Sequence, residues 1–176
     1  SQTNESMLPT WTGETVTVRQ NGHSVAVTAV DEVERGGLSV EKQDSITGST
    51  PQGDANFEGI NFQIINNSRN PVMVEGQKYQ PGEVVKTLVT DAEGKASTSD
   101  DLLPYGEYIL HESATNESML NTVPDQTVLI KDDGVIYEFT CPNEVVRGDV
   151  LIEKRDLESG LLTPLGGASL DGTLFE

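Results

Sequence analysis

The sequence repeats itself at an interval of 112 residues, and this repeat constrains the fold more than any other feature. The hexapeptide TNESML begins at Thr3 and again at Thr115. A longer phrase occurs as DEVERGGLSVEKQDSITG from Asp31 and as NEVVRGDVLIEKRDLESG from Asn143. Both pairs keep one ungapped register, which argues against chance. A period of this size predicts an array of whole domains, since the units of thin solenoids have about 20–45 residues.

The repeat divides the chain into three predicted parts. Residues 1–36 correspond to the C-terminal strands of a preceding repeat, residues 37–148 to one complete repeat, and residues 149–176 to the N-terminal part of a following repeat. The longer phrases then lie at the joints, where the last strand of one repeat leads into the first strand of the next. The chain starts at Ser1 and stops inside a repeat, so we expect it to be an excerpt of a longer protein.

Short alternating runs of Val, Ile and Thr predict an all-β fold for the complete repeat. No stretch has the sustained periodicity of an amphipathic helix. A hairpin turn is expected at 75–76, a turn at 91–94 after which the chain returns along 95–98, and a further turn at 132–134 between the last two strands. Such a pattern is typical of a β-sandwich. The expected strands are 38–43, 60–66, 72–74, 78–79, 84–90, 95–98, 108–112, 126–131 and 135–141.

The composition limits the partners. The chain has 29 acidic and 11 basic residues, and its net charge of −18 argues against nucleic acid, because phosphate binding requires a basic face. No apolar run is long enough to insert into a membrane. A single cysteine, Cys141, excludes a disulfide framework within the chain. We expect no cofactor and no metal ion, because TDAEGKA lacks the full calcium-loop pattern and His23 and His111 lack companions at ligand spacing.

Three polar residues continue the apolar rows of predicted strands. Side chains two residues apart in a strand share a face. Lys42, Glu112 and Asn143 each end such a row, in LSVEK, YILHE and YEFTCPN respectively. Exposed strand ends would explain each residue by itself. A buried Lys–Glu salt bridge would explain two of them, although such a bridge often gains nothing over apolar packing.

A third explanation is a reaction among the three side chains. Burial disfavours charge, so it lowers the pKa of a lysine and raises that of a glutamate. A neutral Lys42 amine would be a nucleophile, and a protonated Glu112 could hydrogen-bond the Asn143 carboxamide and transfer protons. Attack on the carboxamide with loss of ammonia would leave an isopeptide bond. Amides react slowly, so positioning must supply much of the rate, about 7–11 kcal/mol in well-oriented intramolecular reactions.

Five segments, in chain order, carry a family resemblance: LSVEKQDSITG, TPQGDANFEGINFQI, TDAEGKA, LPYGEYILHES and FTCPNEVVRGDVLIEK. They resemble the Cna B-type repeats of Gram-positive surface adhesins and pilins, also called SpaA-like or prealbumin-like domains. The resemblance covers residues 37–148 and both partial repeats. It implies a transthyretin-like (prealbumin-like, Ig-like) β-sandwich and, as in many members, an internal Lys–Asn or Lys–Asp isopeptide bond assisted by Glu or Asp.

The resemblance also implies roles for the three residues. Lys42 would be the nucleophile, Asn143 the acceptor and Glu112 the catalytic acid of a single-turnover self-crosslinking reaction, so the protein would not be an enzyme. In the partial repeats, Asp31 occupies the acceptor position and Lys154 the nucleophile position. A crossed bond between Asp31 and Lys154 is disfavoured. The loop after Glu112, ESATNESML, departs from the family pattern because it lacks the usual Ala-Pro and Gly-Tyr pairs.

These features predict a structural stalk repeat of a bacterial cell-surface adhesin or pilin-like protein. The protein would be extracellular and anchored to the cell wall through regions outside this sequence. Its partners would be neighbouring repeats of the same chain and, through other domains, a host matrix or surface ligand. The absence of a YPKN-like motif and an LPxTG signal favours a long stalk over a polymerised pilin. The alternative is a module that recognises a host matrix protein or glycan. A hydrolase is disfavoured, because no nucleophile–base pair is evident.

Overall fold

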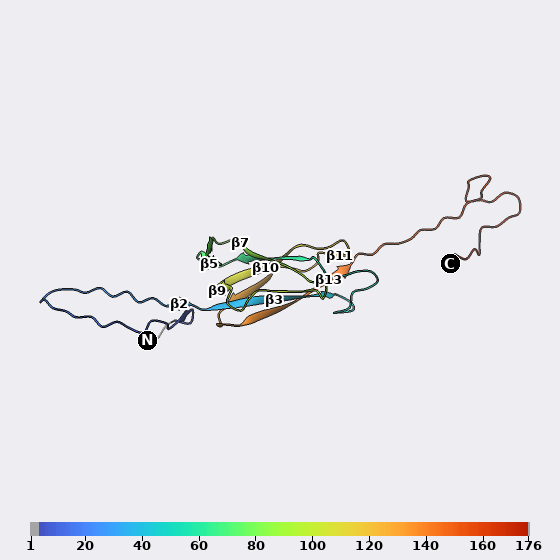
Figure 1. Cartoon of the computed structure of the whole chain (residues 1–176). Helices are drawn as coiled ribbons and strands as arrows, with labels where there is room; N and C mark the ends of the chain where they lie inside the picture. The colour runs from blue at the N-terminus through green and yellow to red at the C-terminus, as the bar shows by residue number, and fades with distance from the viewer. Residues whose placement is uncertain (1–3, 176) are drawn as a thin grey trace. The chain divides into compact units, whose positions relative to one another are not determined.

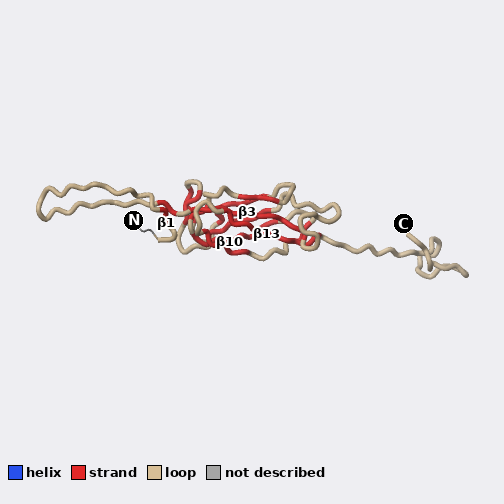
Figure 2. The backbone as a smooth tube through the Cα atoms, turned by 90° about the horizontal axis from the view of Figure 1, so that it is seen from below, coloured by secondary structure: helices blue, strands red, loops and turns tan. Residues whose placement is uncertain are grey.

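The chain forms two compact units, Ser1–Val146 and Arg147–Glu176. The computed structural model describes residues 4–175, so residues 1–3 and 176 of the predicted partial repeats lie outside the described part. Regular structure in the described residues consists of strands and turns (Figure 2). No helix in this part of the chain has the length and apolar character needed to cross a membrane.

All the strands belong to the first unit (Figure 1). Most of them lie in the sandwich, by which we mean residues Arg35–Val145. They are β1 (Met7–Leu8), β2 (Glu32–Val33), β3 (Arg35–Asp44), β4 (Asn61–Asn66), β5 (Val72–Val74), β6 (Gln77–Tyr79), β7 (Val84–Val89), β8 (Lys95–Ser97), β9 (Leu103–Pro104), β10 (Gly106–Ala114), β11 (Met119–Leu120), β12 (Gln126–Ile130) and β13 (Ile136–Val145).

Two sheets form the sandwich. One sheet has the strand order β12-β10-β4-β7, and the other has the order β11-β13-β3-β8, with β9 paired to the beginning of β3. Neighbouring strands are antiparallel except β3 and β13, the first and last strands of the sandwich, which are parallel. Because these two strands run side by side in the same direction, the chain enters at Arg35 and leaves at Val145 at opposite ends of the pair (Figure 1).

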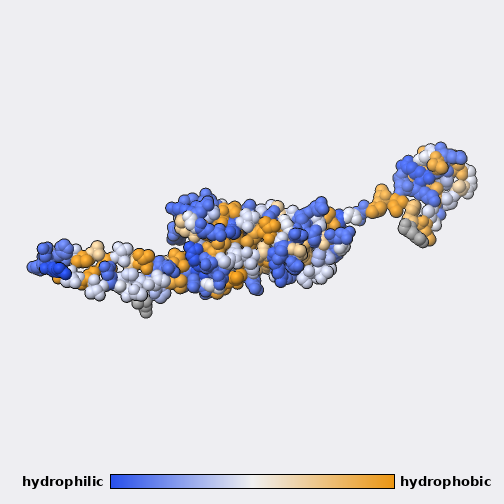
Figure 3. All heavy atoms as spheres, in the orientation of Figure 1, coloured by the Kyte–Doolittle hydropathy of each residue, from blue (hydrophilic) through white to orange (hydrophobic). Residues whose placement is uncertain are grey.

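The hydrophobic core lies between the sheets, because each long strand buries alternate side chains. Burying a side chain the size of Leu, Ile or Phe contributes about 1.5–3 kcal/mol. The outer surface is mixed, with polar and apolar side chains interspersed over the face visible in Figure 3. Core residues include Leu38 and Val40 of β3, Phe62 and Ile64 of β4, Tyr108 and Leu110 of β10, Val128 and Ile130 of β12, and Cys141 of β13.

The all-β sandwich prediction is confirmed, and so is the short hairpin formed by β5 and β6. Its turn residues Glu75 and Gly76 have φ angles of 50° and 80°, the left-handed conformation that a tight two-residue hairpin turn requires. The expected turn at 91–94 is present, with the N–H of Gly94 donating to the carbonyl of Asp91 at 3.0 Å, but the strands on either side of it do not pair with each other. The strand before this turn, β7, pairs with β4, whereas the strand after it, β8, pairs with β3 in the other sheet.

The turn at 132–134 also carries the chain from one sheet to the other, because β12 pairs with β10 and β13 pairs with β3. Both turns have residues that are typical of a hairpin turn. Local turn chemistry reverses the chain direction, but it does not determine which sheet receives the next strand. That choice depends on which face of each strand must be buried in the sandwich.

The segment before the sandwich contains one strand pair. In it Met7 is opposite Val33, and 112 residues later Met119 is opposite Val145 in the same antiparallel register. Residues 9–31 contain no strand, and only Glu34 separates β2 from β3. The division of the chain into one complete and two partial repeats stays a prediction.

The second unit contains no strand within its described residues. Its local geometry nevertheless matches a turn of the sandwich. The N–H of Gly160 donates to the carbonyl of Asp156 at 2.9 Å, and the N–H of Gly48 donates to the carbonyl of Asp44 at the same distance. The two turns are 112 residues apart, which is the repeat interval.

Candidate functional site

The sandwich brings the three predicted site residues together in its core. Lys42 on β3 and Asn143 on β13 come from adjacent strands of one sheet, and Glu112 on β10 faces them from the other sheet. Their exposed fractions are 1 %, 0 % and 2 % respectively. The inward-facing phase predicted for them is confirmed, and exposed strand ends no longer explain them.

One carboxyl group connects the other two side chains. Lys42 Nζ donates to Glu112 Oε2 at 3.0 Å, and Asn143 Nδ2 donates to Glu112 Oε1 at 2.6 Å. The amine also donates to the main-chain carbonyl of Cys141 at 2.9 Å and lies 5.8 Å from the centroid of the Phe62 ring. The amine and the carboxamide are therefore held by the two oxygens of the same group.

Strand register explains why these side chains meet. In the parallel pair, Lys42 lies opposite Cys141 and Asn143 lies two residues farther along β13, on the same face. The main-chain N–H of Lys42 donates to the carbonyl of Gly94 at 2.8 Å, which ties β3 to the 91–94 turn. The Asn121 side chain donates to the main-chain carbonyl of Glu112 at 2.8 Å and ties the end of β10 to the segment after β11.

Burial dominates the electrostatics of the site. It lowers the pKa of Lys42, and the hydrogen bond and negative charge of Glu112 oppose this effect only in part. A lowered pKa increases the neutral fraction of the amine, which is the nucleophilic form. Burial also raises the pKa of Cys141 to about 11, so this residue is a neutral core thiol and no competing nucleophile.

Sequence reasoning missed two features of the site. The carboxamide oxygen of Asn143 accepts hydrogen bonds of 3.4 Å from both the main-chain N–H and the hydroxyl of Thr122. Gly94, with φ +78°, lies against β3, and a Cβ added there would be 3.1 Å from Lys42 Cβ and 2.9 Å from Phe57 Cβ. Neither residue belongs to an alternating strand pattern, so the periodicity used for prediction could not find them.

The Gly94 contact predicts a large cost for a small substitution. Gly94→Ala should lower the free energy of unfolding by about 1–3 kcal/mol more than Gly134→Ala, because overpacking adds to backbone strain. Gly134 is a matched control, since it has φ +71° but no atom within 4 Å of an added Cβ. Chemical denaturation of both variants measures the difference. Equal losses would show that the space beside Lys42 is not restricted.

Two further predicted residues lie outside this cluster. Asp31 accepts a hydrogen bond of 3.0 Å from the main-chain N–H of Trp11. Lys154 donates to the Thr173 hydroxyl at 2.9 Å. Each residue thus contacts its own predicted partial repeat, and the roles assigned to them by repeat alignment stay predictions.

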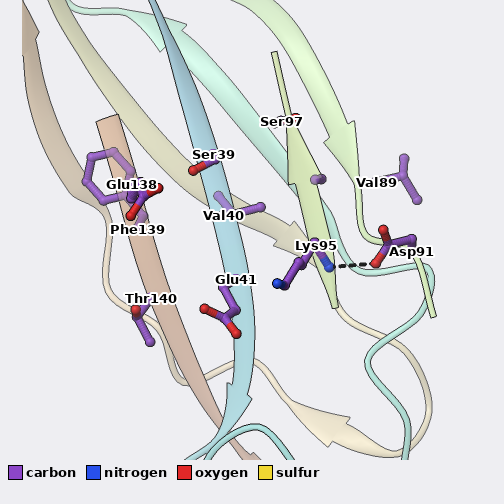
Figure 4. A pocket seen from close by; sticks show the side chains of 11 residues that line it. Ser39, Val40, Glu41, Val89, Asp91, Lys95, Ser97, Glu138, Phe139 and Thr140 are labelled. Carbon is purple, nitrogen blue, oxygen red and sulfur yellow. Dashed lines mark hydrogen bonds between the residues drawn. The ribbon is translucent and has the colours of Figure 1, made fainter. Parts of the chain in front are cut away.

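A groove of about 540 Å³ lies beside β8 (Figure 4). Ser39, Glu41, Glu138 and Thr140 contribute to its wall from outward-facing positions on β3 and β13. The dashed line in Figure 4 is the 2.8 Å hydrogen bond from the main-chain N–H of Lys95 to the Asp91 carboxylate. None of the three predicted site residues lines this groove.

No curated protein matches the sequence. Among solved structures, the Bacillus anthracis TIE protein is similar at 23% identity over 66% of this chain and 18% of its own, with a TM-score of 0.49. The full-length major pilin SpaD of Corynebacterium diphtheriae is 16% identical over 64% of this chain and 30% of its own, with a TM-score of 0.46. The minor pilin GBS52 of Streptococcus agalactiae is 22% identical over 70% of this chain and 51% of its own, also with a TM-score of 0.46. The chain thus spans less than two thirds of each of these proteins.

The family comparison agrees with the five segments identified in the sequence. The family model described as SpaA, a prealbumin-like fold domain, matches residues 36–145. This range is more than half of the 176 residues and nearly coincides with the sandwich. The chain belongs to the SpaA family of prealbumin-like fold domains.

Proposed function

We propose that the sandwich is a tension-bearing module of an extracellular surface stalk and that an isopeptide bond between Lys42 and Asn143 closes it. The observation that carries this proposal is the bridging carboxyl of Glu112, at 3.0 Å from the amine and 2.6 Å from the amide nitrogen. A buried salt bridge alone would not require an amide on the second carboxyl oxygen. A carboxyl in contact with both nucleophile and leaving group is the arrangement that proton transfer requires.

The reaction needs no external reagent. The neutral Lys42 amine attacks Cγ of Asn143, and a bond forms between Nζ and Cγ. The Glu112 carboxylate takes one proton from Nζ on Oε2. Rotation of the carboxyl group then brings this proton to Nδ2, so Glu112 returns to the carboxylate form. The bond between Cγ and Nδ2 then breaks and ammonia leaves. The remaining hydrogen on Nζ keeps the Cys141 carbonyl as its acceptor, at 2.9 Å before reaction.

The bond would tie the first strand of the sandwich to the last. It closes a loop of about 100 residues, and a cross-link of that size is expected to stabilise a fold by about 4.7 kcal/mol through the entropy of the unfolded chain. Each site reacts once, because Asn143 is consumed. The module is therefore structural and does not turn over a substrate.

The proposed setting is the surface of a Gram-positive cell, with neighbouring repeats of the same chain as the immediate partners. The joint before the sandwich supports a stalk. A single residue, Glu34, separates β2 from β3, and its carbonyl accepts a 2.7 Å hydrogen bond from the N–H of Tyr105 within the sandwich. Consecutive modules joined in this way transmit tension directly from one β-strand to the next.

Intact-mass measurement of the denatured protein tests the bond. We expect the wild-type chain to be lighter than its sequence mass by one ammonia molecule. Lys42→Ala should have its full sequence mass, because the nucleophile is missing. Asn143→Asp should lose water in place of ammonia, because the leaving group changes with the acceptor.

Lys154→Ala is the matched control, because Lys154 occupies the equivalent position of the next predicted repeat. It should keep the loss of ammonia. A wild-type chain of full sequence mass would refute the bond. A Lys154→Ala chain of full sequence mass would show that Lys154, and not Lys42, is the reacting lysine. Proteolytic mapping of a peptide that joins β3 to β13 would locate the linkage.

A further inference from the structure

The orientation of the Asn143 carboxamide is fixed by its partners. The main-chain N–H of Thr122 can only donate, so the group facing it at 3.4 Å is the oxygen, Oδ1. The Thr122 hydroxyl donates to the same oxygen at 3.4 Å. The nitrogen, Nδ2, therefore faces Glu112, as its 2.6 Å hydrogen bond requires.

The proposed reaction places a negative charge on that oxygen. When an amine adds to a carboxamide, Oδ1 becomes an oxyanion, and donors aimed at it lower the barrier. Glu112 cannot supply this help, since its two oxygens already serve Nζ and Nδ2. In the described part of the chain, the hydrogen bonds to Oδ1 come from Thr122.

We infer that Thr122 is a catalytic residue of the cross-linking reaction and that its N–H and hydroxyl form the oxyanion hole. This inference rests on the proposed function. Hydrogen bonds to a reacting oxygen are often long in a ground-state structure. They shorten only in the transition state, where the oxygen has moved out of the amide plane. The 3.4 Å distances therefore place both donors near the oxygen before the charge develops.

The fold holds Thr122 in place from two sides. Its neighbour Asn121 donates to the main-chain carbonyl of Glu112 at 2.8 Å, which anchors the segment to β10. Leu120, one residue earlier, pairs with Glu144 of β13, next to Asn143. The two donors of Thr122 are thus fixed both to β10, which carries Glu112, and to β13, which carries Asn143. Such preorganisation makes an oxyanion hole effective.

The test follows bond formation in time. Newly made chains are produced in a short pulse of cell-free synthesis and quenched at intervals in acidic denaturant, and the fraction that has lost ammonia is measured by intact mass. Thr122→Val removes the hydroxyl and keeps the shape. We expect it to slow the reaction by about tenfold or more, toward the 10²–10³-fold effect of removing a well-aligned oxyanion donor. Thr122→Ser keeps both donors and should react at nearly the wild-type rate.

A stability measurement separates catalysis from folding. In the Lys42→Ala background no bond forms, and Thr122→Val should leave the denaturation midpoint of that background nearly unchanged. If Thr122→Val reacts as fast as wild type, or if it destabilises the Lys42→Ala background enough to unfold it, the inference is overturned while the proposed function stands. If the wild-type chain never loses ammonia, both are overturned.

Discussion

Tension applied through the residues that flank the sandwich should leave the wild-type module at nearly its folded length, whereas Lys42→Ala should extend abruptly. With the bond in place, force passes along β3 to Lys42, across to Asn143 and out through the last residues of β13. Residues 43–142 then carry no load. Without the bond these 100 residues are pulled straight, which adds about 330–360 Å of contour length at about 3.3–3.6 Å per residue.

Single-molecule force spectroscopy measures this length directly. Lys95→Ala is a suitable control, because this lysine lies on β8 of the same sheet but faces the groove and not the core. It should behave like wild type. A wild-type module that extends as far as Lys42→Ala would show that no covalent tie spans the sandwich.

Removal of Glu112 should be the most damaging substitution at the site. Glu112→Ala should abolish the proposed bond and leave Lys42 buried, with the Cys141 carbonyl as its remaining acceptor. Breaking a buried ion pair from one side typically costs about 3–5 kcal/mol, because one charge stays without its partner. We expect Glu112→Ala to be less stable than Asn143→Ala by about this amount, since Asn143→Ala also lacks the bond but keeps the Lys42–Glu112 pair.

Denaturation at several pH values tests whether the unpaired charge of Lys42 causes the loss of stability in Glu112→Ala. Burial lowers the pKa of Lys42, and the two influences of Glu112 that raise it disappear in Glu112→Ala. Between the folded-state pKa and the unfolded value of 10.5, the unfolded chain binds more protons, so stability rises with pH. Glu112→Ala should therefore regain stability as the pH rises toward 10.5, and more strongly than Asn143→Ala. Parallel pH profiles for the two variants would contradict an unpaired buried lysine.

Alternation along the chain was enough to predict much of the fold. Side chains two residues apart share a face, so the apolar rows in LSVEK, YILHE and YEFTCPN predict that Lys42, Glu112 and Asn143 point inward. The structure confirms that all three are buried. Strand pairing was harder to predict. Nothing local to 91–94 or 132–134 indicates that each turn joins different sheets, since sheet membership depends on contacts between residues distant in sequence.

The residues that surround the three site residues, Thr122 and Gly94, could be identified only from the structure. Thr122 lies in an irregular segment between β11 and β12, and its position beside Asn143 follows from the pairing of Leu120 with Glu144. A threonine in a loop carries no periodic signal. Gly94 could be recognised as a turn glycine, but its contact with Lys42 exists only because β8 joins the sheet of β3.

The parallel pairing of β3 with β13 also has a consequence for biosynthesis. In the proposed reaction the nucleophile would be made early and the acceptor late, because Lys42 precedes Asn143 by almost the whole module. The proposed cross-link could therefore not form before the last strand of the sandwich is complete. Only docking of β13 beside β3 assembles the site. Formation of the proposed bond would thus mark a finished module, and a copy truncated before Asn143 would lack the acceptor.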